Sequence, residues 1–254
     1  RIGESLQFII GKALWWRVMA SMCSEGVTTV IREKKRSHQK QWGIPPIANY
    51  SIKNSSEACD LFEKYLAFVF EYDKEAWHPL SCHLYSIYEA SESPHAKALS
   101  VSVAVEAILA MLELPDETEN ESLASELSLV KDLIDKSSIR ETTKSRLFGS
   151  LGAMHRPSVS AKLTSLVDKN VIRSKDVKAW KNLRNRFVHG CAPHGFDHDE
   201  LQSMHTLTDS ALVLLYHLVM YRIGYRGIFT DYSEFGWPDI NTSSITIANA
   251  KEDA

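Results

Sequence analysis

Hydrophobic positions recur at steps of three and four along most of the chain, and this spacing places them on one face of an α-helix. The pattern begins near Ser55 and continues to about Ile223. It predicts helices at about residues 55–70, 77–91, 95–114, 123–134, 142–154, 158–167, 174–190 and 199–223. We therefore expect a mainly α-helical bundle.

The predicted helix at 95–114 is apolar almost all round, so we expect it to lie at the centre of the core. Glu106 is the one charged residue within its apolar run from Leu99 to Leu112. A buried carboxylate is costly unless it is paired. Two alternatives are open: Glu106 lies on a narrow wet side of the helix, or it meets Arg184 or His189 from a later helix.

The first 53 residues lack this regular pattern. A short helix is predicted at 5–14, and two strands at 15–23 and 27–31 form a hairpin joined at 24–26. A lone hairpin is marginal in water, so we expect it to be the remnant of a sheet that begins upstream of Arg1. The predicted organisation is the end of an upstream β-rich domain and a linker at 1–53, a helical bundle at 54–226 and a C-terminal extension at 227–254.

The predicted linker carries a cluster of basic residues that includes Lys34, Lys35 and Arg36, followed by Trp42. Basic side chains beside an aromatic ring can hold single-stranded RNA. The same composition is also typical of a solvated linker. The basic cluster is therefore either an RNA contact or part of a solvated linker.

Composition limits the possible functions. The chain has 254 residues, of which 44% are hydrophobic, and a formal net charge of −3, so any contact with nucleic acid depends on a local patch. No apolar run is long enough to span a bilayer. Its four cysteines are widely spaced, which favours reduced thiols in a cytoplasmic protein over a metal site. Motifs of nucleotide-driven enzymes, serine hydrolases and zincins are absent.

The most informative stretch is 184–190, Arg-Asn-Arg-Phe-Val-His-Gly, which closes the helix predicted to start near Ser174. Gly190 suits the left-handed conformation that ends helices. Asn185 and His189 lie one turn apart on the same helical face, whereas Arg184 is more than about 100° away around the helix. A long arginine side chain, or a second copy of the helix, is needed to bring Arg184 and His189 to one site.

These residue types suit cleavage of a phosphodiester bond in RNA. A histidine can transfer protons near neutral pH, arginine offers a fork of donors to phosphate oxygens, and an asparagine amide can hold an oxygen or fix the imidazole tautomer. Such a site needs no metal and no cofactor, because the 2′-hydroxyl of RNA serves as the nucleophile. The alternative is ordinary helix-end chemistry, in which cations stabilise the dipole and His precedes a terminal Gly.

The stretch resembles the signature of HEPN-domain proteins, in which Arg and a polar residue precede His at the end of a helix. Arg184, Asn185 and His189 match that signature, and the similarity extends over about residues 55–235, including 180–183 and 223–227, towards the subgroup related to ApeA anti-phage defence proteins. The resemblance implies a metal-independent endoribonuclease that acts as a dimer through its motif helices. It also implies an N-terminal β-rich domain. Cys191 departs from the HEPN toxins regulated by nucleotidylation, which carry Tyr there.

Three hypotheses follow. The first is a HEPN-type, metal-independent endoribonuclease in anti-phage defence, with Arg184, Asn185 and His189 as catalytic residues, Glu106 as an orienting acid and Arg186 as an RNA contact. The second is a non-catalytic HEPN module that binds RNA or a partner. The third is a helical dimerisation scaffold. For the first, we expect RNA as substrate, a homodimer, no membrane association and a cytoplasmic location.

Overall fold

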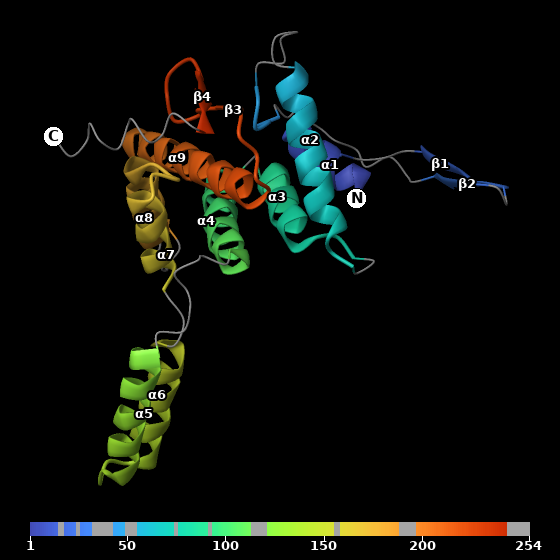
Figure 1. The fold of residues 1–254 in the computed structure, drawn as a ribbon. Helices are drawn as coiled ribbons and strands as arrows, with labels where there is room; N and C mark the ends of the chain where they lie inside the picture. Colours follow the sequence, from blue (N-terminus) through green and yellow to red (C-terminus); the bar gives the residue numbers. More distant parts are fainter. Residues whose placement is uncertain are drawn as a thin grey trace.

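The computed structural model describes residues 1–14, 18–23, 26–31, 43–48, 55–73, 76–90, 93–112, 121–154, 158–187 and 197–242. Over these ranges the chain is mainly α-helical, which confirms the predicted fold class (Figure 1). The helices are α1 Ile2–Ile10, α2 Ser55–Phe70, α3 Pro79–Glu89, α4 Pro94–Met111, α5 Glu121–Lys136, α6 Glu141–Met154, α7 Val159–Asp168, α8 Ser174–Phe187 and α9 His198–Arg222. The strands are β1 Val18–Cys23, β2 Gly26–Ile31, β3 Ile228–Thr230 and β4 Asp239–Asn241.

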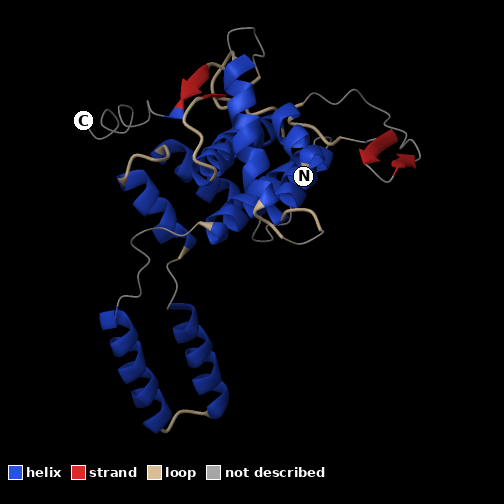
Figure 2. Ribbon diagram, turned by 45° about the vertical axis from the view of Figure 1, so that its right-hand side comes forward, coloured by secondary structure: helices blue, strands red, loops and turns tan. Residues whose placement is uncertain are grey.

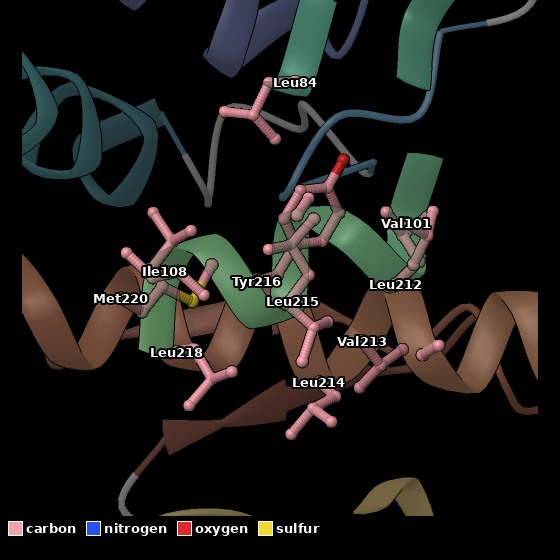
Figure 3. Packing of buried hydrophobic residues seen from close by; sticks show 14 of the residues in the cluster. Leu84, Val101, Ile108, Leu212, Val213, Leu214, Leu215, Tyr216, Leu218 and Met220 are labelled. Carbon is pink, nitrogen blue, oxygen red and sulfur yellow. The ribbon is translucent and has the colours of Figure 1, made fainter. Parts of the chain in front are cut away.

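Helix α9 is the centre of the core. Every residue from Ala211 to Met220 is buried, so this half of the helix has no face in water. Both α4 and α8 pack along α9. Figure 3 shows Val101 and Ile108 of α4 on one side of α9, whereas Leu214 and Leu218 point to the other side. A helix that is apolar on all sides must be covered on all sides. Neighbouring segments cover this half of α9 more completely than they cover α4.

Helix α4 was predicted to be the central helix, and most of it is buried in the same core. One stripe along it faces solvent, however, with Leu99 and Val103 exposed by 47% and 42%. The prediction that no apolar run is long enough to span a bilayer does not hold for α4 by length and composition alone, but core helices of soluble proteins meet the same criterion. The prediction that α4 belongs to the core is thus confirmed, apart from this stripe.

Side-chain caps define several helix starts. Ser93 Oγ accepts a hydrogen bond from the Ala96 amide at 3.3 Å, and Pro94 occupies the first turn of α4. Asp197 caps α9 by accepting from the Glu200 amide at 2.8 Å. Helix α3 begins at Pro79, two residues later than predicted, because His78 caps it. The capping residues of these helices are therefore polar. Each is followed either by Pro or by acidic residues in the first turn of the helix.

The N-terminal segment shares the helical core. Helix α1 begins earlier than predicted and ends at Gly11, whose φ of 63° and close approach to Ile44 both require glycine. Phe8 stacks on Tyr65 with ring centroids 4.1 Å apart. Ile47 and Phe229 are buried in the same cluster. Divisions of the chain at residues 53 and 226 stay predictions, but packing is continuous across them.

Within the described residues, two short antiparallel hairpins accompany the helices (Figure 2). Strands β1 and β2 pair from Val18 opposite Ile31 to Cys23 opposite Gly26, which confirms the predicted hairpin. Strands β3 and β4, which the hydrophobic pattern did not indicate, pair through Phe229 and Ile240. Helices α5 and α6 form a helical hairpin that stands away from the body in both views. Leu129 and Leu133 on α5 are exposed.

A buried charged cluster joins the start of α8 to the segment after β3. Arg173 Nε donates to Asp176 at 2.6 Å, and Arg173 Nη1 donates to Asp231 at 2.5 Å. Burial raises the pKa of Asp176 to about 6 despite the neighbouring guanidinium. Burial also acts on Asp231, but hydrogen bonds from Arg173 and Ser233 outweigh it and hold the pKa of Asp231 below its usual value.

We predict that Arg173→Met lowers the free energy of unfolding by about 3–5 kcal/mol, because two buried carboxylates lose their cation. Lys175→Met is the matched control, since Lys175 bridges α8 to the same segment through an exposed ion pair with Glu234 and should cost at most about 1 kcal/mol. Urea unfolding followed by circular dichroism measures both. Equal losses in the two variants would contradict the structural role of the cluster.

His205 and His217 both lie on α9, but their surroundings differ. His205 is exposed. His217 is 2% exposed and packs edge-on against Phe229, with ring centroids 4.4 Å apart. Neither of its ring nitrogens has a hydrogen-bond partner among the described residues. Burial and the nearby charge of Arg173 lower the pKa of His217 to about 3.

His217 should make the protein sensitive to acid. The folded protein keeps this imidazole neutral, whereas the unfolded chain protonates it below a pKa of about 6.5. The free energy of unfolding therefore decreases as the pH falls from about 6.5 towards 3, because protonation of His217 favours the unfolded chain. In His217→Leu, the fall in unfolding free energy between pH 7 and pH 5 should be about 2 kcal/mol smaller than in the wild type. Urea titrations at both pH values, with His205→Leu as control, measure this; an unchanged fall contradicts the prediction.

Candidate functional site

Helix α8 presents one face to the core and one to solvent. Val177, Trp180 and Leu183 are buried, which confirms the predicted apolar stripe. Trp180 Nε1 donates to the carbonyl oxygen of Ser102 on α4 at 3.3 Å, which fixes the rotation of α8 against α4. The polar residues of the last turn consequently lie away from the core.

Arg184 and Glu106 form an ion pair between α8 and α4. Arg184 Nε donates to Glu106 Oε1, and the guanidinium carbon lies 5.9 Å from the centroid of the Trp180 ring. The two side chains are 37% and 38% exposed. The predicted contact between Glu106 and Arg184 is therefore confirmed, and the alternative also holds in part, because Glu106 lies at the wet side of α4.

The ion pair lies within an exposed stripe of α4. Leu99, Val103, Glu106 and Ala110 follow one another at steps of four, three and four, so they share one helical face. Leu99, Val103 and Ala110 are exposed, and Glu106 is half-buried. Arg184 is thus held by a carboxylate that stands among small and apolar side chains on an open surface.

Asn185 and Arg186 are both exposed, but their surroundings differ. Arg186 is held by the start of α9, with Nη2 3.1 Å from Glu200 Oε1 and Nη1 3.3 Å from Ser203 Oγ. Asn185 precedes it on the outer face of α8. Arg186 was predicted to contact RNA, and its bonds to α9 make it a link between two helices as well.

Several predicted site residues lie outside the described residues. His189 and Gly190 fall beyond the described end of α8 at Phe187, and Cys191 follows them. The basic residues Lys34, Lys35 and Arg36 also lie outside. The structure thus brings Glu106 and Arg184 together and locates Asn185 and Arg186, whereas the approach of His189 to Arg184 stays a prediction.

Metal ligands do not gather in the described part of the chain. No group of three or more His, Cys, Asp and Glu side chains comes together there with the arrangement of a metal site. Cys59 and Cys82 are exposed free thiols. The chemistry open to the described site residues is the binding and orientation of an anion by Arg184.

Comparison with known proteins gives no further assignment. No protein-family model matches the chain, and neither a curated protein nor a solved structure matches it.

We predict that the Glu106–Arg184 pair contributes little to folding, because both side chains are more than one-third exposed. In a double-mutant cycle of Glu106→Ala, Arg184→Ala and the double variant, the coupling energy from urea unfolding should be at most about 1 kcal/mol. A coupling above about 2 kcal/mol would instead assign the pair to structural support.

Proposed function

We propose that the chain is a metal-independent endoribonuclease in which Arg184 binds the scissile phosphate and His189 transfers protons. The observation that carries this proposal is how the guanidinium group of Arg184 is held. Its Nε is held by Glu106, and no bond from either terminal amino group to a described residue is present. A partly exposed, oriented guanidinium fork suits the oxygens of a phosphate.

In the proposed reaction the 2′-hydroxyl oxygen of the RNA attacks the adjacent phosphorus. One imidazole takes the hydroxyl proton as general base, and an imidazolium gives a proton to the departing 5′-oxygen. The products are a 2′,3′-cyclic phosphate and a 5′-hydroxyl end. Arg184 stabilises the charge that builds on the phosphoryl oxygens, while Asn185 positions the phosphate or the imidazole of His189.

Glu106 acts in this proposal as a positioning residue. A free arginine side chain loses about 2 kcal/mol of rotamer entropy when it is fixed. Glu106 and the Trp180 ring hold Arg184 before RNA arrives, so less of that cost falls on binding. The carboxylate also reduces the local positive charge, which limits binding of other anions.

The proposal includes a homodimer formed through the motif helix. The exposed stripe with Leu99 and Val103 stands beside the Glu106–Arg184 pair. Burial of such apolar side chains against the same stripe of a second copy would favour association. The two copies of Arg184, Asn185 and His189 would then face one shared RNA path.

The second candidate function is an RNA- or partner-binding module without catalysis. It is favoured by the ion pairs of Arg184 and Arg186, since paired arginines also occur at surfaces with no reaction to perform. This module would bind RNA and leave it intact. A third candidate, a dimerisation scaffold, would neither bind nor cleave RNA.

The test compares wild type, His189→Ala and Arg184→Ala on RNA substrates with EDTA present. We expect the wild type to cleave, Arg184→Ala to lose about 10²–10³-fold in rate and His189→Ala to show no cleavage. His205→Ala, which removes an exposed histidine of α9, is the matched control and should cleave as the wild type does. Circular dichroism and light scattering confirm that fold and oligomeric state are unchanged.

The outcomes separate the candidates. Cleavage by His189→Ala at the wild-type rate refutes the assigned mechanism. RNA that binds to all four proteins and stays intact at high protein concentration supports the binding module. Activity that EDTA removes would require a metal and would overturn the metal-independent mechanism.

A further inference from the structure

A pocket of about 340 Å³ lies at the other end of α8 from Arg184. Its walls come from the turn between α7 and α8, the second half of α9, and the residues around β3 and β4. Helix α8 has 14 residues, so its two ends are about 20 Å apart. The pocket is therefore separate from the proposed nuclease site.

The inner wall of the pocket carries polar groups without partners. His217 lines it, is 2% exposed, and has no hydrogen bond at either ring nitrogen within the described residues. Thr242 also lines it, and its Oγ1 is buried and has no partner among them. Each unmade hydrogen bond of a buried group costs about 1–3 kcal/mol. A neutral imidazole offers one donor and one acceptor, so this wall suits a ligand that carries both.

The outer part of the pocket is cationic. Lys169 and Arg226 line it, and both are exposed. None of the described residues that line the pocket is acidic. A ligand with a negative charge at its outer end would therefore be attracted to this opening.

The remaining walls are aromatic and held in place. Tyr221 and Tyr225 line the pocket, and the Tyr225 hydroxyl donates to Glu57 at 2.9 Å. Asn170 at the rim of the pocket has a φ of 55°, and its backbone N–H donates to the carbonyl oxygen of Val167 at 2.8 Å. Tyrosine rings beside a polar inner wall suit a planar ring with hydrogen-bonding edges.

We propose that this pocket binds a small planar anion of the nucleoside monophosphate class. Its heteroaromatic ring lies between the tyrosines and exchanges hydrogen bonds with His217 and Thr242. Its phosphate lies outside, at Lys169 and Arg226. The volume is within the range of small-molecule sites, and the proposal does not depend on nuclease activity.

Isothermal titration calorimetry with the full chain tests this binding. The probes are AMP, GMP, CMP and UMP, with inorganic phosphate and benzoate to separate the contributions of phosphate and ring. We expect at least one nucleotide to bind with Kd below about 1 mM, and phosphate and benzoate to bind at least about tenfold more weakly. The titrations are repeated in the Arg184→Ala background, which removes the guanidinium proposed to bind phosphate at the nuclease site.

Three variants complete the experiment. His217→Leu should lower nucleotide affinity at least about tenfold while it folds at least as stably as the wild type, since an unpartnered polar group is removed. Arg226→Ala should also weaken binding, and Lys136→Ala, an exposed lysine on α5 far from the pocket, should leave it unchanged. Overturning results are the absence of nucleotide binding, unchanged affinity in His217→Leu, or phosphate binding as tightly as the nucleotides.

Discussion

The burial of α9 on all sides is the constraint on which the other elements depend. From Ala211 to Met220 the helix offers no polar face to water, so it is stable only where other segments surround it. Helices α4 and α8 cover it along its length, and Phe229 of β3 contacts it through His217. Because Trp180 and Leu183 must face this core, the last turn of α8 presents Arg184 and Asn185 outwards.

Much of the fold could be predicted from periodicity, because helices bury residues at regular steps. The apolar stripe of α8 and the pairing of β1 with β2 agree with the structure. The exposed stripe of α4 could not be predicted, since a sequence pattern shows how apolar a helix is and not which of its sides a neighbour covers. Leu99 and Val103 look like core residues until their exposure is known.

The candidate site was predictable only in part. A lone acid in an apolar run needs a partner, which is why Glu106 could be linked to Arg184. The cluster of Arg173, Asp176 and Asp231 could not be predicted. Arg173 and Asp231 are 58 residues apart in the sequence, and none of the three residues belongs to a periodic pattern. The lack of hydrogen bonds from the His217 ring nitrogens to described residues could not be predicted either, because the sequence does not show which partners a histidine in a helix will meet.

Contacts between segments far apart in the sequence also bear on how the protein is made. Tyr216 bonds to the carbonyl of Ile44, and Tyr232 to that of Pro45, which lies 187 residues earlier. Such distant pairings slow folding, because a long loop must close before they form. During synthesis, the early segments emerge from the ribosome long before α9 exists. Their apolar side chains must therefore stay exposed until α9 has been synthesised, which makes the nascent chain a natural client for chaperones.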